Sequence, residues 1–222
     1  MDNLRVEFHC HTVFSKDSLT RPEQLVEAAR RKGLGRVIVT DHNAIGGALR
    51  ARQIDPALII VGEEIMTTRG EILAAFVSEE IPAGLTPQET IRRLREQGAF
   101  ISVSHPFDVQ RGGHWELPDL LEIAPQVDAI ETFNSRCIQP EFNLRAQDFA
   151  REHGLRGTVG SDAHTTQELG RSVLILEAFA NADELRAVIG RAQADTHLSS
   201  PLIHLTSRYA VLIKKLGGGR TI

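Results

Sequence analysis

Residues 4–42, LRVEFHCHTVFSKDSLTRPEQLVEAARRKGLGRVIVTDH, contain a complete strand, helix and strand. Alternating apolar residues at 4–8 predict the first strand, and the apolar run that ends at Thr40 predicts the second. The helix between them begins at Pro22, which suits a first helical turn, and ends before Gly33, which suits a helix stop. Such an opening is typical of proteins whose strands are largely parallel.

The same alternation of short apolar runs and longer amphipathic patterns continues through the chain. Further strands are expected at residues 58–62, 72–77, 100–104, 129–133, 157–160 and 173–176. Further helices are expected at residues 87–97, 117–123, 141–153 and 182–192. With 222 residues, the chain is shorter than the roughly 250 of a complete eight-stranded barrel. We therefore predict one α/β domain in the form of a small, distorted (β/α) barrel.

Composition and charge narrow the class of protein. Hydrophobic residues make up 41% and charged residues 24%, as in ordinary folded domains. The formal net charge of -4 lacks the basic excess typical of nucleic-acid binding, so we expect no stable nucleic-acid partner. No apolar run approaches the roughly 18 residues of a spanning helix, and two cysteines are too few for a disulfide scaffold. We expect a cytoplasmic protein with no membrane partner.

A short helix is predicted near the C-terminus, at residues 207–215, with Arg208, Lys214 and Lys215 on it. This charge pattern could belong to a membrane-surface element. It is more typical of a helix that packs its apolar side on the protein and leaves its charges in solvent. We expect the second arrangement.

Potential metal ligands follow six of the expected strands, at the point where each strand ends. They are His9 and His11, Asp41 and His42, Glu63 and Glu64, His105, Glu131, and Asp162 and His164. Because the C-terminal ends of parallel strands meet at one edge of a sheet, these side chains should lie close together. Imidazole nitrogens and carboxylate oxygens suit zinc, manganese or iron. The sequence therefore predicts a catalytic metal centre at this edge.

Six motifs, in this order, resemble those of the PHP (polymerase and histidinol phosphatase) superfamily of metal-dependent phosphoesterases. They are FHCHTVFSKDS (8–18), VTDHNAIGG (39–47), VGEEI (61–65), SHPF (104–107), IETFN (130–134) and GSDAH (160–164). The resemblance runs from about residue 5 to residue 175 and is closest to short, stand-alone members. It implies a distorted seven-stranded, TIM-like barrel at residues 1–200, which binds two or three divalent metal ions, and a C-terminal helical tail at residues 201–222.

The resemblance also implies which residues bind the metals. The expected groups are His9, His11, Glu64 and Asp162 for one ion, Glu64 and His105 for a second, and Asp17, His42 and His164 for the remaining one. The last group is also expected to take part in catalysis. Glu64 is assigned rather than Glu63 because the family's motif has a glycine two residues before the ligand, which is Gly62 here.

One departure from the family concerns the second ion. Many members supply a further histidine from a short strand that matches GEILAAFV (70–77). This chain has only Ile72, Leu73, Ala74 and Ala75 at that place, so the second site is expected to be incomplete.

Four more residues are expected near the substrate. Glu131 and Asn134 fit the family's IE-x-x-N pattern, and they should support the metal ligands or contact the substrate. Arg111 and Arg136 follow strand ends and are candidate phosphate clamps.

The expected function is hydrolysis of a small phosphorylated substrate, such as a phosphomonoester, a nucleotide or a short oligonucleotide. Two close metal ions would neutralise the phosphoryl oxygens and activate water. Two alternatives remain open. One is an amidohydrolase-like hydrolase, since that class also has an HxH pair on its first strand and a late aspartate. The other is a non-catalytic metal-binding module, like the PHP-like domains attached to some polymerases.

Overall fold

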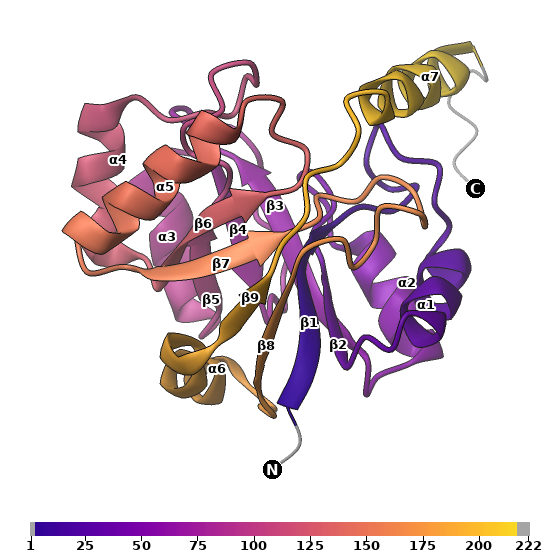
Figure 1. The fold of residues 1–222 in the computed structure, drawn as a ribbon, viewed down its shortest axis with the longest axis horizontal. Coiled ribbons are helices and arrows are strands. Elements are labelled where there is room, and N and C mark those ends of the chain that lie inside the picture. The colour runs from indigo at the N-terminus through magenta and orange to yellow at the C-terminus, as the bar shows by residue number, and fades with distance from the viewer. Residues whose placement is uncertain (1–2, 217–222) are drawn as a thin grey trace.

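A rolled sheet of nine strands forms the centre of the protein, as seen in the computed structural model, which describes residues 3–216 (Figure 1). The strands are β1 (Asn3–Cys10), β2 (Arg36–Val39), β3 (Ile59–Met66), β4 (Glu71–Ala75), β5 (Phe100–Val103), β6 (Ala129–Asn134), β7 (Arg156–Gly160), β8 (Val173–Glu177) and β9 (Gln193–Asp195). The helices are α1 (Pro22–Arg31), α2 (Gly46–Ile54), α3 (Pro87–Glu96), α4 (Leu117–Ile123), α5 (Pro140–Glu152), α6 (Ala182–Val188) and α7 (Ile203–Leu216).

The sheet is mixed, with strand order β7-β6-β5-β4-β3-β2-β1-β8-β9. Strands β1, β2 and β3 are parallel, as are β5, β6 and β7, but β4 runs antiparallel to both of its neighbours. Beyond β1, strands β8 and β9 continue the sheet as an antiparallel extension. The mixed α/β architecture agrees with the prediction. The expected seven-stranded, TIM-like barrel is not confirmed, because this extension and the reversed β4 depart from that pattern.

The sheet nearly closes into a barrel at the end of β1. Cys10 bridges to Ala163, which follows β7, and the backbone N–H of His11 donates to the carbonyl of Ala163 at 2.8 Å. The buried Glu7 carboxylate reinforces this seam, since it accepts from the backbone N–H of Ser161 at 2.9 Å and from that of Gly170 at 2.8 Å. The seam brings the first strand beside the seventh, so ligand-type residues from the two halves of the chain become neighbours.

Helices cover the outside of the sheet. Figure 1 shows α1 and α2 on one side of the molecule and α3, α4 and α5 on the other. Helix α1 buries Leu25, Val26 and Ala29, which lie on one side of the helix at the spacing that an amphipathic helix requires. Helix α2 was not predicted, because it begins at a glycine pair after Ile45, whose side chain cannot cap a helix. Among the helices within residues 3–216, none has the length and apolar character needed to cross a membrane.

Helix α7 lies at the open end of the barrel, apart from the other helices (Figure 1). Its inward contacts are largely polar: the ammonium of Lys214 donates to the carbonyl of Val13 at 2.6 Å. Several of its large apolar side chains face outward, with Leu205 58% and Leu212 53% exposed. The expectation that this helix packs its apolar side on the protein is therefore wrong.

Strand β3 carries two adjacent buried carboxyl groups, Glu63 and Glu64, which point to opposite faces of the sheet. Glu63 accepts one hydrogen bond, from the backbone N–H of Ile81 at 3.0 Å, and its other oxygen has no hydrogen-bond partner within residues 3–216. Burial is the main reason that the pKa of Glu63 rises from 4.5 to about 8, and the nearby carboxylate of Glu80 adds to the effect. The folded protein therefore holds a proton on Glu63 at neutral pH.

We predict that Glu63→Gln stabilises the protein at alkaline pH. Because the folded-state pKa of Glu63 lies above its unfolded value, the native state loses stability as the pH rises from about 4.5 to about 8. A neutral glutamine removes that loss, so the variant should exceed the parent by a few kcal/mol at pH 8 and by much less at pH 5. Urea unfolding with a chelator present, at both pH values, measures the difference. Glu79→Gln, which removes the charge of an exposed glutamate, is the control. An equal pH dependence of the unfolding free energy in all three proteins would contradict the assignment.

Candidate metal centre

Histidine and carboxylate side chains converge at the C-terminal rim of the barrel. They come from the ends of β1 and β3, from the start of β4, and from the loops that follow β1, β2, β5 and β7. The structure brings together all eight residues that the sequence analysis assigned as ligands: His9, His11, Asp17, His42, Glu64, His105, Asp162 and His164. Three groups of ligand atoms each lie within 4.8 Å of one another, namely His11, His42 and His164; His9, His11 and Glu64; and His42, Glu64 and Glu71.

His9 and His11 face each other through their Nε2 atoms, which lie 3.1 Å apart. The Ser15 hydroxyl donates its hydrogen to Asp41 at 2.7 Å, so it can only accept from Nδ1 of His11, at 3.0 Å. His11 therefore carries its proton on Nδ1 and presents a lone pair on Nε2. His9 in turn places Nδ1 3.0 Å from the Glu131 carboxylate, which favours a proton there and a second lone pair on Nε2. Two lone pairs at this separation require a cation between or beside them.

Electrostatics support the same conclusion. Burial, together with the imidazoles of His164 and His42, lowers the pKa of His11 to about 3, so this ring is neutral. Burial also disfavours a charge on His9, but the carboxylates of Glu64, Asp162 and Glu131 outweigh it and raise the pKa of His9. Without a metal ion, a proton on His9 would supply the positive charge that these carboxylates require.

Glu64 lies at the centre of the cluster and is fully buried. Its Oε2 lies 2.9 Å from Nδ1 of His42 and 3.3 Å from Nε2 of His9, and this oxygen has no hydrogen-bond partner among the described residues. Its Oε1 accepts from the Ser104 hydroxyl at 2.6 Å and lies 3.2 Å from Nε2 of His105. A carboxylate whose two oxygens lie near different histidines is suited to bridge two ions.

Glu71 is a site residue that the sequence analysis missed. Its Oε1 lies 3.6 Å from Nδ1 of His42, and its Oε2 lies 3.5 Å from Nε2 of His105. It stands in the short strand that supplies the further histidine in many members of the family, one residue before Ile72. The loop after β5 encloses it, since a Cβ on Gly113 would lie 2.0 Å from the Glu71 carboxylate and Trp115 donates to the Glu71 carbonyl at 3.0 Å. The cluster therefore has a carboxylate near the place where the resemblance leads one to expect a histidine.

Asp17 completes the outer part of the cluster. Its Oδ2 lies 3.2 Å from Nε2 of His164 and 3.7 Å from Nε2 of His42. Both Asp17 and His42 have side chains that are 19% exposed, whereas Glu64 and His9 are at 0%. This outer group is thus the part of the cluster that meets solvent.

The donor set fits divalent metal ions. Imidazole nitrogens and carboxylate oxygens are the ligands preferred by zinc, manganese and iron, and the two cysteines, Cys10 and Cys137, are buried as free thiols. Removing so many carboxylates from water is unfavourable unless positive charge is placed among them. Proteins orient metal-binding histidines by letting the outer nitrogen donate a hydrogen bond, as Nδ1 of His9 does to Glu131 and Nδ1 of His11 does to Ser15.

Glu131 and Asn134 lie behind the ligands. The Glu131 carboxylate accepts from the backbone N–H of His105 at 2.9 Å and from the Asn134 amide at 3.1 Å, and that amide also reaches Asp162 at 3.2 Å. Both side chains are buried, at 2% and 1% exposure. Their position favours a role in orienting ligands over the expected contact with substrate.

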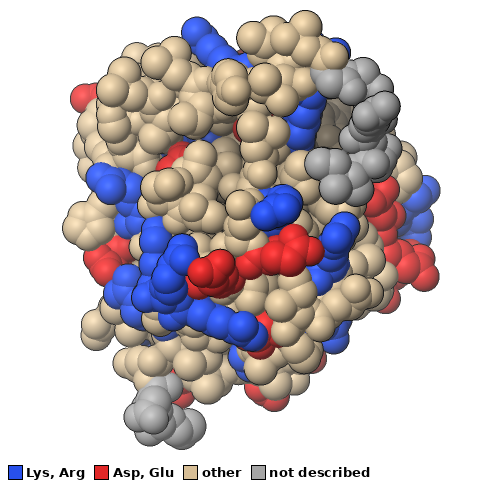
Figure 2. Space-filling model, turned by 90° about the vertical axis from the view of Figure 1, so that its right-hand side faces the viewer, with Lys and Arg blue, Asp and Glu red and all other residues tan. Residues whose placement is uncertain are grey.

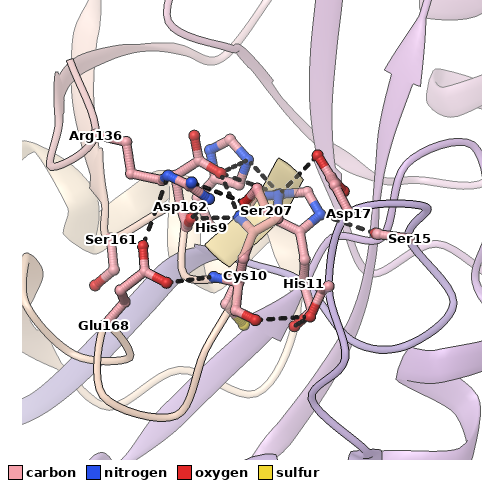
Figure 3. Close-up of polar contacts among 12 residues, drawn as sticks. His9, Cys10, His11, Ser15, Asp17, Arg136, Ser161, Asp162, Glu168 and Ser207 are labelled. Carbon is pink, nitrogen blue, oxygen red and sulfur yellow. Dashed lines mark hydrogen bonds and ion pairs between the residues drawn. The ribbon is translucent and has the colours of Figure 1, made fainter. Parts of the chain in front are cut away.

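Arg111 and Arg136 both line the cleft above the cluster, but they contact different groups of the protein. Arg111 forms ion pairs with Asp162 and, at 3.1 Å, with Asp108. Arg136 is 4% exposed and lies between Glu168, at 3.6 Å, and the Ser207 hydroxyl, at 2.9 Å (Figure 3). Arg136 is therefore held beside Glu168 and Ser207, whereas Arg111 is held beside Asp162, a predicted metal ligand.

The cleft has a volume of about 460 Å³. Its floor contains Asp17, His42, Glu71, His105 and His164. Four cationic side chains line its walls: Lys16, Arg111, Arg136 and Arg208. A pocket of this size and charge is suited to a small anionic molecule.

Comparison with protein families gives two matches along this chain. The model described as the PHP domain matches residues 7–96, and the model described as PHP-associated matches residues 140–194. An uncharacterized protein of Methanocaldococcus jannaschii, MJ0417, is 36% identical over 174 residues, which cover 77% of this chain and 70% of the relative.

Solved structures share the fold at low sequence identity. A two-domain protein of Bacteroides vulgatus, described as containing a predicted PHP-like metal-dependent phosphoesterase, superposes with a TM-score of 0.70 at 22% identity. That match covers 88% of this chain and 65% of the Bacteroides chain. PsfC from Pseudomonas syringae gives a TM-score of 0.71 at 18% identity, with 96% of this chain and 100% of PsfC covered.

We predict that Glu71→Ala lowers the metal content of the protein. Loss of one carboxylate ligand should weaken binding of one ion at least tenfold, while Glu71→His should restore it, because imidazole can take the same place. Elemental analysis after dialysis against limiting manganese gives the ions bound per chain. Glu63→Gln, whose carboxyl points to the other face of β3, is the control. Unchanged stoichiometry and affinity in Glu71→Ala would exclude Glu71 as a ligand.

Proposed function

Because the chain belongs to the PHP domain family, we propose that it is a metal-dependent hydrolase that cleaves phosphate esters, with water as the nucleophile. The observation that carries the proposal is the cluster of histidines and carboxylates around Glu64, at the floor of a cleft with cationic walls. Phosphate esters are anionic, and a cleft of this charge attracts them.

The proposed ligand groups are those that the family resemblance implies, with Glu71 added, and the distances in the cluster are compatible with them. They are His9, His11, Glu64 and Asp162 for one ion, Glu64, Glu71 and His105 for a second, and Asp17, His42 and His164 for a third. We propose two or three ions of manganese, zinc or iron. When bound, they would supply positive charge to the phosphoryl oxygens and lower the pKa of water.

The chain's own residues would bind and orient the substrate. Arg111, on the wall beside Asp162, is assigned to a phosphoryl oxygen, whereas Arg136 is assigned to holding the loop that carries Asp162, whose carbonyl it approaches at 3.4 Å. Glu131 and Asn134 are assigned to orienting the ligands. The substrate would thus lie between the metal-binding residues and Arg111.

Hydrolysis forms a bond between the water oxygen and phosphorus and breaks the ester bond between phosphorus and the alcohol oxygen. The leaving alcohol must take up a proton. In the group of Asp17, His42 and His164, His42 has the most exposed ring, at 19%, and its Nε2 points toward Asp17. With two ions bound, Nε2 of His42 would be free to deliver this proton, with Asp17 holding the ring in position; a third ion would take Nε2 as a ligand, and water at the exposed outer group would then supply the proton.

The substrate is proposed to be small. Figure 2 shows the face that bears α1, α2 and α7, on which basic and acidic side chains are interspersed. Long nucleic acids require a continuous basic surface, whereas a mononucleotide or short oligonucleotide needs only the cleft.

We predict that the double variant His11→Ala, Asp162→Ala binds no metal in the inner group and loses hydrolysis of a chromogenic aryl phosphate with added manganese. Both side chains face the same point, so their removal leaves too few ligands there. Circular dichroism should report a retained fold. His153→Ala, on a histidine at the end of α5 away from the rim, should keep full activity. Undiminished turnover in the double variant, or no turnover by the parent on any phosphate ester, would refute the proposal.

A further inference from the structure

Helix α7 lies across the rim of the barrel and contacts it through hydrogen bonds at both of its ends. Near its end, Lys214 donates to the carbonyls of Val13 and Ser15, in the loop that carries Asp17. Near its start, the ring of His204 lies with Nε2 3.2 Å from the carbonyl of Arg136. The helix therefore has a defined position over the metal centre.

The two sides of α7 face two different cavities. His204, Ser207 and Arg208 line the large cleft of about 460 Å³. Thr206, Tyr209 and Ala210 line a second cavity of about 210 Å³. Each set has the spacing i, i+3, i+4, which places its members on one side of a helix. Helix α7 is thus a partition between the cavities.

Both cavities reach the same two residues, Asp17 and His164. These belong to the outer group of the cluster, where we assign contact with the substrate. A substrate that contacts Asp17 and His164 therefore lies at the boundary of the two cavities.

The walls of the two cavities differ in chemistry. Four basic side chains, Lys16, Arg111, Arg136 and Arg208, line the large cleft along with Asp108 and the carboxylates of the cluster, and these basic groups suit the oxygens of a phosphoryl group. The small cavity has Leu19 and Tyr209 among its walls, 40% and 58% exposed, together with six uncharged polar side chains: Thr20, Gln24, Thr165, Thr166, Gln167 and Thr206. Apart from Asp17 and His164, the side chains that line it are uncharged. Its walls suit the uncharged alcohol part of an ester, with a ring against Tyr209 and polar groups against the Thr and Gln side chains, rather than a second anionic group.

We propose that the small cavity binds the alcohol part of the phosphate ester and that Tyr209 selects a flat ring there. The inference rests on the proposed function and names the substrate class: esters of a small aromatic or heteroaromatic alcohol. Typical small-molecule pockets measure roughly 300–1,000 Å³, so a cavity of about 210 Å³ holds a single ring with few substituents. Tyr209 is a specificity residue, since it contacts the leaving group and not the phosphorus.

The test uses two phosphonates, which cannot be hydrolysed, so that binding is measured apart from turnover. Benzylphosphonate carries a ring in the position of the alcohol, and methylphosphonate does not. Calorimetric titration of the manganese-loaded protein should show tighter binding of benzylphosphonate. Tyr209→Ala should weaken that binding roughly three- to tenfold, the range expected for one aromatic contact, and should change methylphosphonate binding less than twofold.

Two variants complete the experiment. Tyr209→Phe keeps the ring and should bind both compounds as the parent does. Leu212→Ala removes an apolar side chain that is 53% exposed on the same helix and does not line the cavity, so it should change neither affinity. Equal affinity of the parent for both phosphonates, or equal weakening of both in Tyr209→Ala, would overturn the proposal. Failure of the parent to hydrolyse any ester would refute the proposed function instead.

Discussion

The structure depends on positive charge at one point of the barrel rim. Glu64, Asp162 and Glu131 are buried there beside histidines. Because Nδ1 of His9 and Nδ1 of His11 donate hydrogen bonds to Glu131 and Ser15, the lone pairs on their Nε2 atoms face each other. Burying carboxylates without compensation is costly, and this cost is relieved only by a proton or a metal ion. The bonds from Ser104 to Glu64 and from Ser15 to His11 hold the side chains in the orientation that such an ion requires.

Much of this centre can be predicted from sequence because it follows from one rule of sheet geometry. Parallel strands end at the same edge, so the sequence alone places His9, His42 and Asp162 together, although they lie far apart along the chain. The rule does not predict Glu71. Strand β4 runs antiparallel to its neighbours, so its first residue, not its last, lies at the rim. Strand direction is set by pairing with β3 and β5, which the local sequence does not encode.

Other features depend on contacts between distant segments. The sequence identifies Arg136 as a candidate clamp, but its confinement by Glu168 and Ser207 depends on how the C-terminal helix is seated. Amphipathic periodicity predicts that α7 is helical, yet it does not tell which side faces inward. In the structure the side with Lys214 faces the barrel, where Lys214 donates to the carbonyls of Val13 and Ser15, and no pattern of residue types reports where such carbonyls lie. As a result, the helix brings polar residues to the cleft and leaves Leu205 exposed.

The central claim is that ions occupy the rim and are bridged by Glu64. Anomalous scattering from a crystal of the manganese-loaded protein, recorded above the manganese absorption edge, tests it most directly. The account predicts peaks within roughly 2.0–2.2 Å of Glu64, one beside His9 and His11 and another beside Glu71 and His105. A map without peaks at the rim under saturating manganese, with Nε2 of His9 and His11 still 3.1 Å apart, would contradict it.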